Sequence, residues 1–206
     1  MRTLGLLGDA ISIMKRDWRL LAALNALFFC ILVIGAAISV IYPGLHASIV
    51  SIIGADTVAG SMGIAANSGA PGIALSSFFS SFTYLLLITV PSVALPIWGP
   101  IIGASRFFIW GVAYVTPLQG GMAAGNLAAE YVLMFLLGEA YIIAIFACVR
   151  PLSVAVSALG FGFRQVLALY ARSVAENLKL LLVAVILLAA ASLYLALAVP
   201  ALAVIP

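Results

Sequence analysis

The chain has 206 residues, of which 66% are hydrophobic and 7% are charged, and its formal net charge is +3. Soluble globular domains carry about a quarter charged residues, so this composition excludes that class and indicates an integral membrane protein. The length leaves room for roughly four to six helical crossings, so we expect one all-α membrane domain over residues 1–206. Because the basic residues lie beside apolar segments, we expect membrane lipid as a partner and no nucleic acid.

The N-terminal part predicts a helix on the membrane surface followed by a first crossing. Apolar residues recur at spacings of three and four, as in an amphipathic interfacial helix: Leu4, Leu7, Ile11, Met14 and Trp18. The apolar run Leu20–Ile41 is then long enough to cross the membrane, and it ends at Tyr42, Pro43 and Gly44, a typical helix stop.

Residues 45–72 are small and weakly polar, which predicts a loop outside the membrane. The single histidine of the chain, His46, lies in this loop. A lone histidine is far more often a surface residue than a metal ligand, so we expect no metal site.

Residues 74–115 are expected to form two crossings, Ala74–Pro96 and Ile101–Val115, separated by a break. Proline removes an amide donor and clashes with the preceding turn, so three prolines are candidate helix breaks: Pro91, Pro96 and Pro100. We expect a kink near Leu87 and a break around Trp98 to Pro100. The alternative is one crossing plus an interfacial segment.

Gly99 and Gly103 form a Gly-x-x-x-Gly pair at the start of this third crossing. Such a pair permits close approach of two helices. The chain has 18 glycines, so a chance match remains an alternative explanation of the spacing.

The C-terminal half predicts two further crossings. Leu127–Val149 has the length of one crossing and is expected to end at Arg150 and Pro151. Ala158–Lys179 mixes apolar and charged residues and is a second candidate for an interfacial helix. Leu180–Val199 carries no charge and is the last crossing.

The distribution of basic residues predicts the orientation in the cell membrane. With five crossings and a cytoplasmic N terminus, all 9 Lys and Arg residues lie on or near the cytoplasmic side. A four-crossing arrangement would put Arg150, Arg164 and Arg172 on the other side. We therefore expect five crossings.

Three charges lie in predicted crossings: Glu139, Arg106 and Glu130. Glu139 lies about eleven residues, or ~16 Å, from Arg150, near the middle of a ~30 Å bilayer core. A charge there is costly and needs shelter or a partner. Glu139 could form an ion pair with Arg106, bind a proton or cation, or stay protonated because it is buried. Glu130 is expected on roughly the opposite face near the outer interface.

Enzyme signatures are missing from the sequence. It has no His-Glu-x-x-His motif, Gly-x-Ser-x-Gly elbow, phosphate loop or paired acidic cluster. Cys30 and Cys148 lie in apolar runs, where we expect no disulfide. We therefore expect no catalysis and no cofactor.

Two stretches, IIGASRFFIWGVAYV and FLLGEAYIIAIFA, resemble the glycine-rich and acidic segments of the stage II sporulation protein M family of membrane proteins. The order of elements is also similar. The resemblance implies a role in envelope remodelling and places the family's acidic residue at Glu139. The chain departs from the family pattern, because Phe135 stands where the family has histidine, Gly138 is displaced and no Asn-Gly follows Arg106.

Together these features predict a multi-pass scaffold or permease-like subunit that associates with itself or with other membrane subunits. The alternative is a proton- or cation-coupled transporter or channel that uses Glu139. A third hypothesis is an intramembrane enzyme that acts on lipid.

Overall fold

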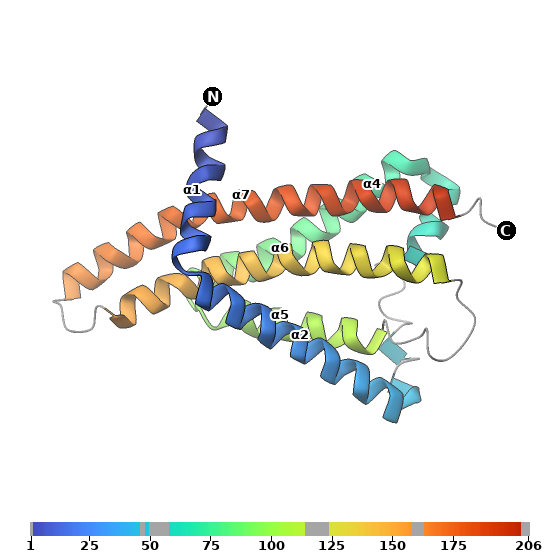
Figure 1. Ribbon diagram of the computed structural model, residues 1–206, viewed down its shortest axis with the longest axis horizontal. Helices are drawn as coiled ribbons and strands as arrows, with labels where there is room; N and C mark the ends of the chain where they lie inside the picture. The colour runs from blue at the N-terminus through green and yellow to red at the C-terminus, as the bar shows by residue number, and fades with distance from the viewer. Residues whose placement is uncertain (1, 46–47, 50–57, 114–123, 158–162, 203–206) are drawn as a thin grey trace.

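The computed structural model is a bundle of helices that run nearly along one long axis (Figure 1). It is described over residues 2–45, 48–49, 58–113, 124–157 and 163–202. Within these ranges the side chains of 2–4, 58–68, 124–130, 155, 157, 163 and 198–202 are not described. The described helices are α1 (Arg2–Arg16), α2 (Trp18–Ile41), α4 (Val58–Ser92), α5 (Trp98–Ala113), α6 (Ala124–Ser157) and α7 (Phe163–Leu202).

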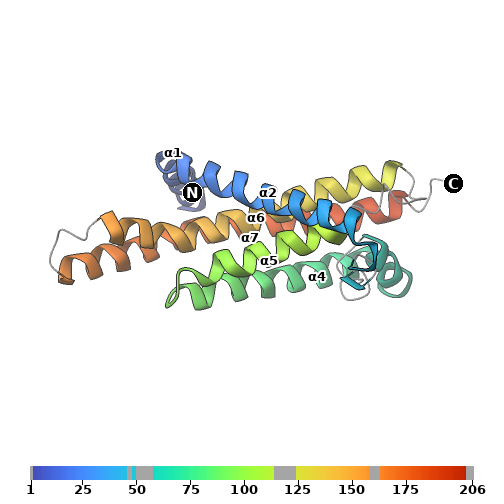
Figure 2. The ribbon, with the colours of Figure 1, turned by 90° about the horizontal axis from the view of Figure 1, so that it is seen from below.

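Four helices are long and apolar enough to cross a membrane, which confirms an all-α architecture of the membrane type. Their candidate spans are Trp18–Ile41, Gly69–Ser92, Tyr131–Val154 and Arg164–Leu197. Helix α5 has 16 residues, so it is only about 24 Å long, less than a ~30 Å bilayer core. It nevertheless lies beside α2 in both views (Figures 1 and 2). The fifth crossing therefore stays a prediction.

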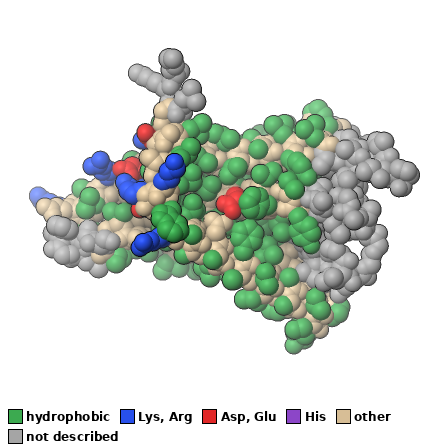
Figure 3. Space-filling model, viewed as in Figure 1, with side chains coloured by type: hydrophobic (Ala, Val, Ile, Leu, Met, Phe, Trp, Pro, Cys, Tyr) green, Lys and Arg blue, Asp and Glu red, His purple; other side chains and the backbone are tan. Residues whose placement is uncertain are grey.

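Charged side chains gather at one end of the bundle (Figure 3). This end holds the junction of α1 and α2, the turn between α4 and α5, and the ends of α6 and α7 that face each other (Figure 1). We call it the charged end, and its ion pairs join Asp9, Arg16, Asp17, Arg150, Arg172, Glu176 and Lys179.

Helix α6 forms the centre of the bundle. It contacts α2, α4, α5 and α7, and each residue from 140 to 147 is at most 5% exposed. An apolar helix that is buried on all sides needs no polar face, which explains why this stretch lacks amphipathic periodicity. The core of the protein is therefore built around α6.

Glycines set the contact between α2 and α5. A Cβ on Gly35 would collide with the carbonyl oxygen of Phe108, and a Cβ on Gly111 would collide with the carbonyl oxygen of Leu32. Only glycine lets the two backbones approach this closely, as in membrane helix pairs that use small residues.

The Gly99 and Gly103 pair is also buried, but its two members face different helices. A Cβ on Gly99 would meet Ile88 and Ser92 of α4, whereas one on Gly103 would meet the Phe28 ring of α2 and Ile145 of α6. The expected motif thus contributes to close packing, although not as one two-helix contact.

Helix α1 lies across the bundle axis at the charged end (Figure 1). Its Ala10 and Ile13 are buried, and the helix contacts α7. Of the expected apolar stripe, Ile11 is 46% exposed and Trp18, the first residue of α2, is 58% exposed, whereas Met14 packs against the core. Only part of the stripe is therefore free to meet lipid, and the interfacial position of this helix stays a prediction.

The predicted boundaries of α6 and α7 were wrong. Helix α6 does not end at Arg150 and Pro151 but continues to Ser157. Ala158–Lys179 is not a separate interfacial helix, because 163–179 belongs to the continuous helix α7. In α6 a contact from α7 overrides the stop signal at Pro151, whereas in α7 no stop signal separates the charged part from the apolar part.

The break between the second and third apolar segments also lies elsewhere than expected. Helix α4 ends at Ser92 and α5 begins at Trp98, so residues 98–100 are helical. Pro96 lies in the intervening turn, and Pro100 lies in the first turn of α5, where its missing N–H has no helical acceptor to lose. Pro91 is the last residue but one of α4. The kink expected near Leu87 stays a prediction.

The predicted loop 45–72 is partly helical. Helix α4 already begins at Val58, and Gly69 interrupts it with a φ of 68°. This left-handed conformation is readily available to glycine, so Gly69 permits the change of direction at the start of the second span. His46 lies outside the described residues.

Candidate functional site

Arg150 is the centre of a polar network at the charged end. Its side chain is only 4% exposed, yet it carries a full positive charge. Its Nε donates to Oδ2 of Asp17 at 2.8 Å and its Nη2 donates to Oε2 of Glu176 at 2.8 Å. Its Nη1 donates to Oδ1 of Asn177 at 3.3 Å. We call these four residues the Arg150 network.

The network joins three segments that are distant in the sequence. Asp17 lies between α1 and α2, Arg150 lies on α6, and Glu176 and Asn177 lie on α7. A buried guanidinium needs acceptors for its donors, and two carboxylates and an amide supply them here. The network therefore holds the ends of these helices in a defined arrangement.

Asn177 also explains how α6 passes through Pro151. Proline has no N–H, so the carbonyl of Ala147, four residues earlier, lacks its helical donor. The Nδ2 of Asn177 donates a hydrogen bond to this carbonyl oxygen. Since Asn177 is buried, its amide satisfies one acceptor on α6 and presents its own oxygen to Arg150.

Further ion pairs surround the network. Arg16 lies 3.5 Å from Asp17 and 3.7 Å from Glu176, and Arg172 lies 3.6 Å from Glu176. Lys179 on α7 pairs with Asp9 on α1 at 2.6 Å. These contacts are more exposed than those of Arg150, so each contributes little to stability. Together they tie α1 to α7.

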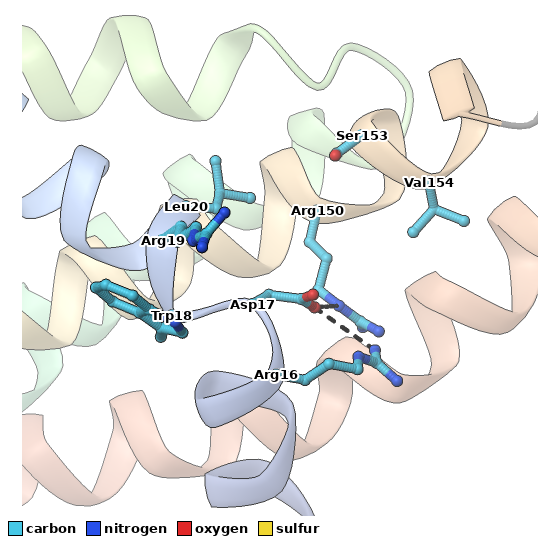
Figure 4. Close-up of a pocket in the computed structure, with 8 residues that line it drawn as sticks. All are labelled: Arg16, Asp17, Trp18, Arg19, Leu20, Arg150, Ser153 and Val154. Carbon is cyan, nitrogen blue, oxygen red and sulfur yellow. Dashed lines mark hydrogen bonds and ion pairs between the residues drawn. The ribbon is translucent and has the colours of Figure 1, made fainter.

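A cavity of about 480 Å³ opens beside the network. It is lined by Arg16, Asp17, Trp18, Arg19, Leu20, Arg150, Ser153 and Val154 (Figure 4). The Asp17 carboxylate points toward the guanidinium groups of Arg150 and Arg16, and Arg19 lies next to Trp18 on the first turn of α2 (Figure 4). Three arginines and one aspartate are thus among the residues that line the cavity.

Glu139, the residue expected to carry function, lies in the central helix α6 and is partly buried. The side chain of Asn25 on α2 lies close to its carboxyl group. Glu139 does not line the cavity at the charged end, nor the two other described cavities. A polar pair between two membrane helices is a common way to shelter such groups.

Arg106 on α5 has aromatic neighbours. Its guanidinium lies 4.8 Å from the centre of the Tyr84 ring and 5.3 Å from that of Trp110. Aromatic faces attract cations, and this attraction is larger where water is excluded. These two rings therefore shelter the Arg106 guanidinium, and its ion pair with Glu139 stays a prediction.

Arg106 belongs to a larger aromatic cluster in the core. Phe107 packs on Phe28 with ring centres 5.1 Å apart and on Trp110 at 5.4 Å. Tyr141 on α6 then contacts Trp110 at 5.7 Å and Tyr84 at 5.4 Å. The cluster fills the space among four helices and surrounds one face of the Arg106 side chain. Glu130 lies in α6, but its side chain is outside the described part.

Sequence reasoning assigned no role to the Arg150 network. A signal was present, because Asp17 and Glu176 are two of the 6 acidic residues and both lie among basic residues. Isolated acids within basic segments often mark ion pairs. The contribution of Asn177 has no comparable signal, since it depends on which carbonyl Pro151 leaves unpaired.

The described arrangement has no obvious catalytic geometry. Among the residues with described side chains, no group of three His, Cys, Asp or Glu could hold a metal ion. Comparisons with protein-family models, with curated proteins and with solved structures give no match to this chain.

Proposed function

We propose that the chain is a non-enzymatic, multi-pass membrane protein that acts as a scaffold or permease-like subunit of a membrane assembly. The membrane location is supported by four helices with the length and composition of membrane spans. The resemblance to the stage II sporulation protein M family stays a prediction, because no family model matches the chain.

The observation that carries the proposal is the hairpin formed by α6 and α7. Helix α7 has 40 residues, or about 60 Å, twice a ~30 Å bilayer core. The hairpin continues past the Arg150 network at the charged end (Figure 1). There Val156 is 56% and Leu167 is 56% exposed. The candidate span Arg164–Leu197 has 34 residues, more than the ~20 that a bilayer core needs, so we place the hairpin tip outside the core. Large apolar side chains exposed there are a common feature of surfaces that bind protein partners.

The packing of the bundle supports a scaffold more than a conduit. The central stretch of α6 is buried on all sides, and the aromatic cluster fills the space next to it. A pathway through one chain would need water or polar side chains around Glu139. None of the three described cavities is lined by Glu139.

The second candidate is a proton- or cation-coupled transporter or channel. The observation that favours it is Glu139, a carboxyl group inside a candidate span, with the neutral side chain of Asn25 close by. Carboxyl groups at such depth are frequent in ion pathways.

One experiment separates the two candidates. A photo-crosslinking amino acid is placed at Leu167 on the hairpin, and a matched control carries it at Leu193, which is 59% exposed on the apolar part of α7. The scaffold proposal expects a protein adduct from position 167 in intact membranes, and none or far less from position 193. Absence of any adduct, together with proton flux in proteoliposomes that Glu139→Gln abolishes, would support the transporter instead.

We also propose five crossings with a cytoplasmic N terminus. The proposal is supported by the position of α5 next to α2 in the bundle (Figure 2) and by the gathering of basic residues at one end (Figure 3). Positive charge is retained on the cytoplasmic side of membrane proteins.

A further inference from the structure

The cavity beside the Arg150 network has an excess of positive charge. Arg16, Arg19 and Arg150 line it, whereas Asp17 is its one lining carboxylate. Glu176 lies behind it, 3.7 Å from Arg16. When Glu176 is counted with the lining residues, the three arginines still outnumber the two acids. An anion is therefore the complementary occupant.

The three arginines have different tasks. Arg150 is buried and already holds Asp17, Glu176 and Asn177. Arg16 is 59% exposed, and its guanidinium comes no closer than 3.5 Å to its acidic partners. Arg19 lies over the Trp18 ring at 6.0 Å, and no described carboxylate forms an ion pair with it. Arg16 and Arg19 thus keep donors that can bind an anion.

The position of the cavity indicates where this anion comes from. Its lining includes Trp18 and Leu20, at the start of the apolar span Trp18–Ile41. Tryptophan is enriched at the level of the lipid headgroups, and the indole of Trp18 is largely exposed. The cavity therefore opens at the depth where phosphate groups of phospholipids lie.

We propose that this cavity binds a phosphate group through Arg16 and Arg19, with Ser153 as a further hydroxyl on its wall. Guanidinium groups bind phosphate with paired, charge-assisted hydrogen bonds. The group is the headgroup phosphate of an anionic phospholipid or a free phosphate ion, which share this chemistry. The site is independent of whether the bundle acts as a scaffold or a transporter.

The test measures lipid retained by the intact, detergent-purified chain in native mass spectrometry. Phosphatidylglycerol is the probe, phosphatidylcholine is the zwitterionic comparator, and inorganic phosphate is the competitor. We expect one tightly retained phosphatidylglycerol per chain. Arg16→Gln and Arg19→Gln should each weaken retention about 5-fold, and the double variant about 25-fold, at ~1 kcal/mol per basic residue.

Arg164→Gln is the matched control, because Arg164 is an exposed basic residue of α7 that does not line the cavity. It removes the same charge and should change retention less than 2-fold. Displacement of the lipid by millimolar inorganic phosphate in wild type, and not in the double variant, would assign the site to the free ion. Equal retention by wild type and the double variant would overturn the proposal, as would an equal loss in Arg164→Gln.

Discussion

Asn177 on α7 donates a hydrogen bond to the carbonyl oxygen of Ala147 on α6, the carbonyl that Pro151 leaves without a helical donor. A proline near the end of a membrane helix usually marks its stop. Here a side chain from the neighbouring helix supplies the missing donor, and α6 continues for six residues beyond the proline, to Ser157.

The first prediction follows from this exchange of donors. Asn177→Leu should lower the free energy of unfolding by about 1–3 kcal/mol, because it strands a buried carbonyl and removes an acceptor of Arg150. In a Pro151→Ala background the backbone N–H returns, so the same substitution should cost at least ~0.5 kcal/mol less. Thermal unfolding in detergent measures both costs. Gln165→Leu, an exposed change on the same helix, is the control, and additive effects of the two substitutions would contradict the explanation.

The second prediction concerns the charges around Arg150. Asp17→Asn alone leaves Glu176 as a counter-charge, so its effect should be moderate. Asp17→Asn with Glu176→Gln leaves the buried guanidinium without any carboxylate. This should lower the free energy of unfolding by about 3 kcal/mol or more. The double variant should lose more free energy of unfolding than the two single variants together, and the sign of this coupling tests the prediction.

The control for these charge changes is Arg172→Gln. Arg172 pairs with Glu176 at 3.6 Å but is 79% exposed, so its loss should cost less than ~1 kcal/mol. A double variant that unfolds at the wild-type temperature would show that the network adds nothing to stability.

The third prediction tests the contact of α2 and α5. Gly111→Ala places a methyl group against the carbonyl oxygen of Leu32, and the helices must separate to accept it. We expect a loss of about 1–3 kcal/mol, the usual range for overpacking. Gly8→Ala is the control, because nothing lies within 4 Å of its new Cβ; it should leave stability unchanged or raise it by up to ~1 kcal/mol. Equal effects of the two changes would contradict the close contact.

The fourth prediction separates the partners of Glu139. If its carboxyl group interacts with Asn25 and not with Arg106, the double-mutant coupling of Glu139→Gln with Arg106→Gln should stay below ~0.5 kcal/mol. The coupling of Glu139→Gln with Asn25→Leu should exceed this value. Unfolding of the two sets of single and double variants in detergent gives both coupling energies. A large Glu139–Arg106 coupling would instead support the ion pair expected from the sequence.

The fifth prediction is topological. Cysteines introduced at Ser61 and Gly120, in a chain whose Cys30 and Cys148 are replaced by alanine, should both react with an impermeant maleimide added outside sealed cells. Five crossings with a cytoplasmic N terminus place both positions outside. Labelling at position 61 with protection at position 120 would favour four crossings and an interfacial α5.

Composition and hydropathy were sufficient to predict the helical membrane architecture, because a ~30 Å apolar core imposes its length on any helix that crosses it. They could not predict where α6 and α7 end. The stop signal at Pro151 is overridden by Asn177, and two charges of 163–179, Glu176 and Lys179, pair with α1 and α6. Such effects depend on neighbours that are distant in the sequence.

The same limit applies to the site. Glu139 could be singled out as a candidate from the sequence, because a carboxyl group in an apolar run is unusual. Arg150 was assigned only to orientation, since a basic residue at a helix end is ordinary in a membrane protein. Its burial with Asp17, which is 133 residues away, follows from how α1 crosses the bundle. The partners of Arg106 likewise required the fold, because rings from α4 and α5 meet its guanidinium.

The continuity of α7 has a mechanical consequence. From Phe163 to Val199 the helix contains neither glycine nor proline, and sharp bends in helices nearly always need one of these residues or a comparable defect. The helix therefore acts as a stiff lever about 60 Å long, with the Arg150 network as its fulcrum. A push on the hairpin tip at Arg164 would tilt the opposite arm, and because Leu180, Ala184 and Leu188 of that arm are buried, the tilt would displace the core packing as well.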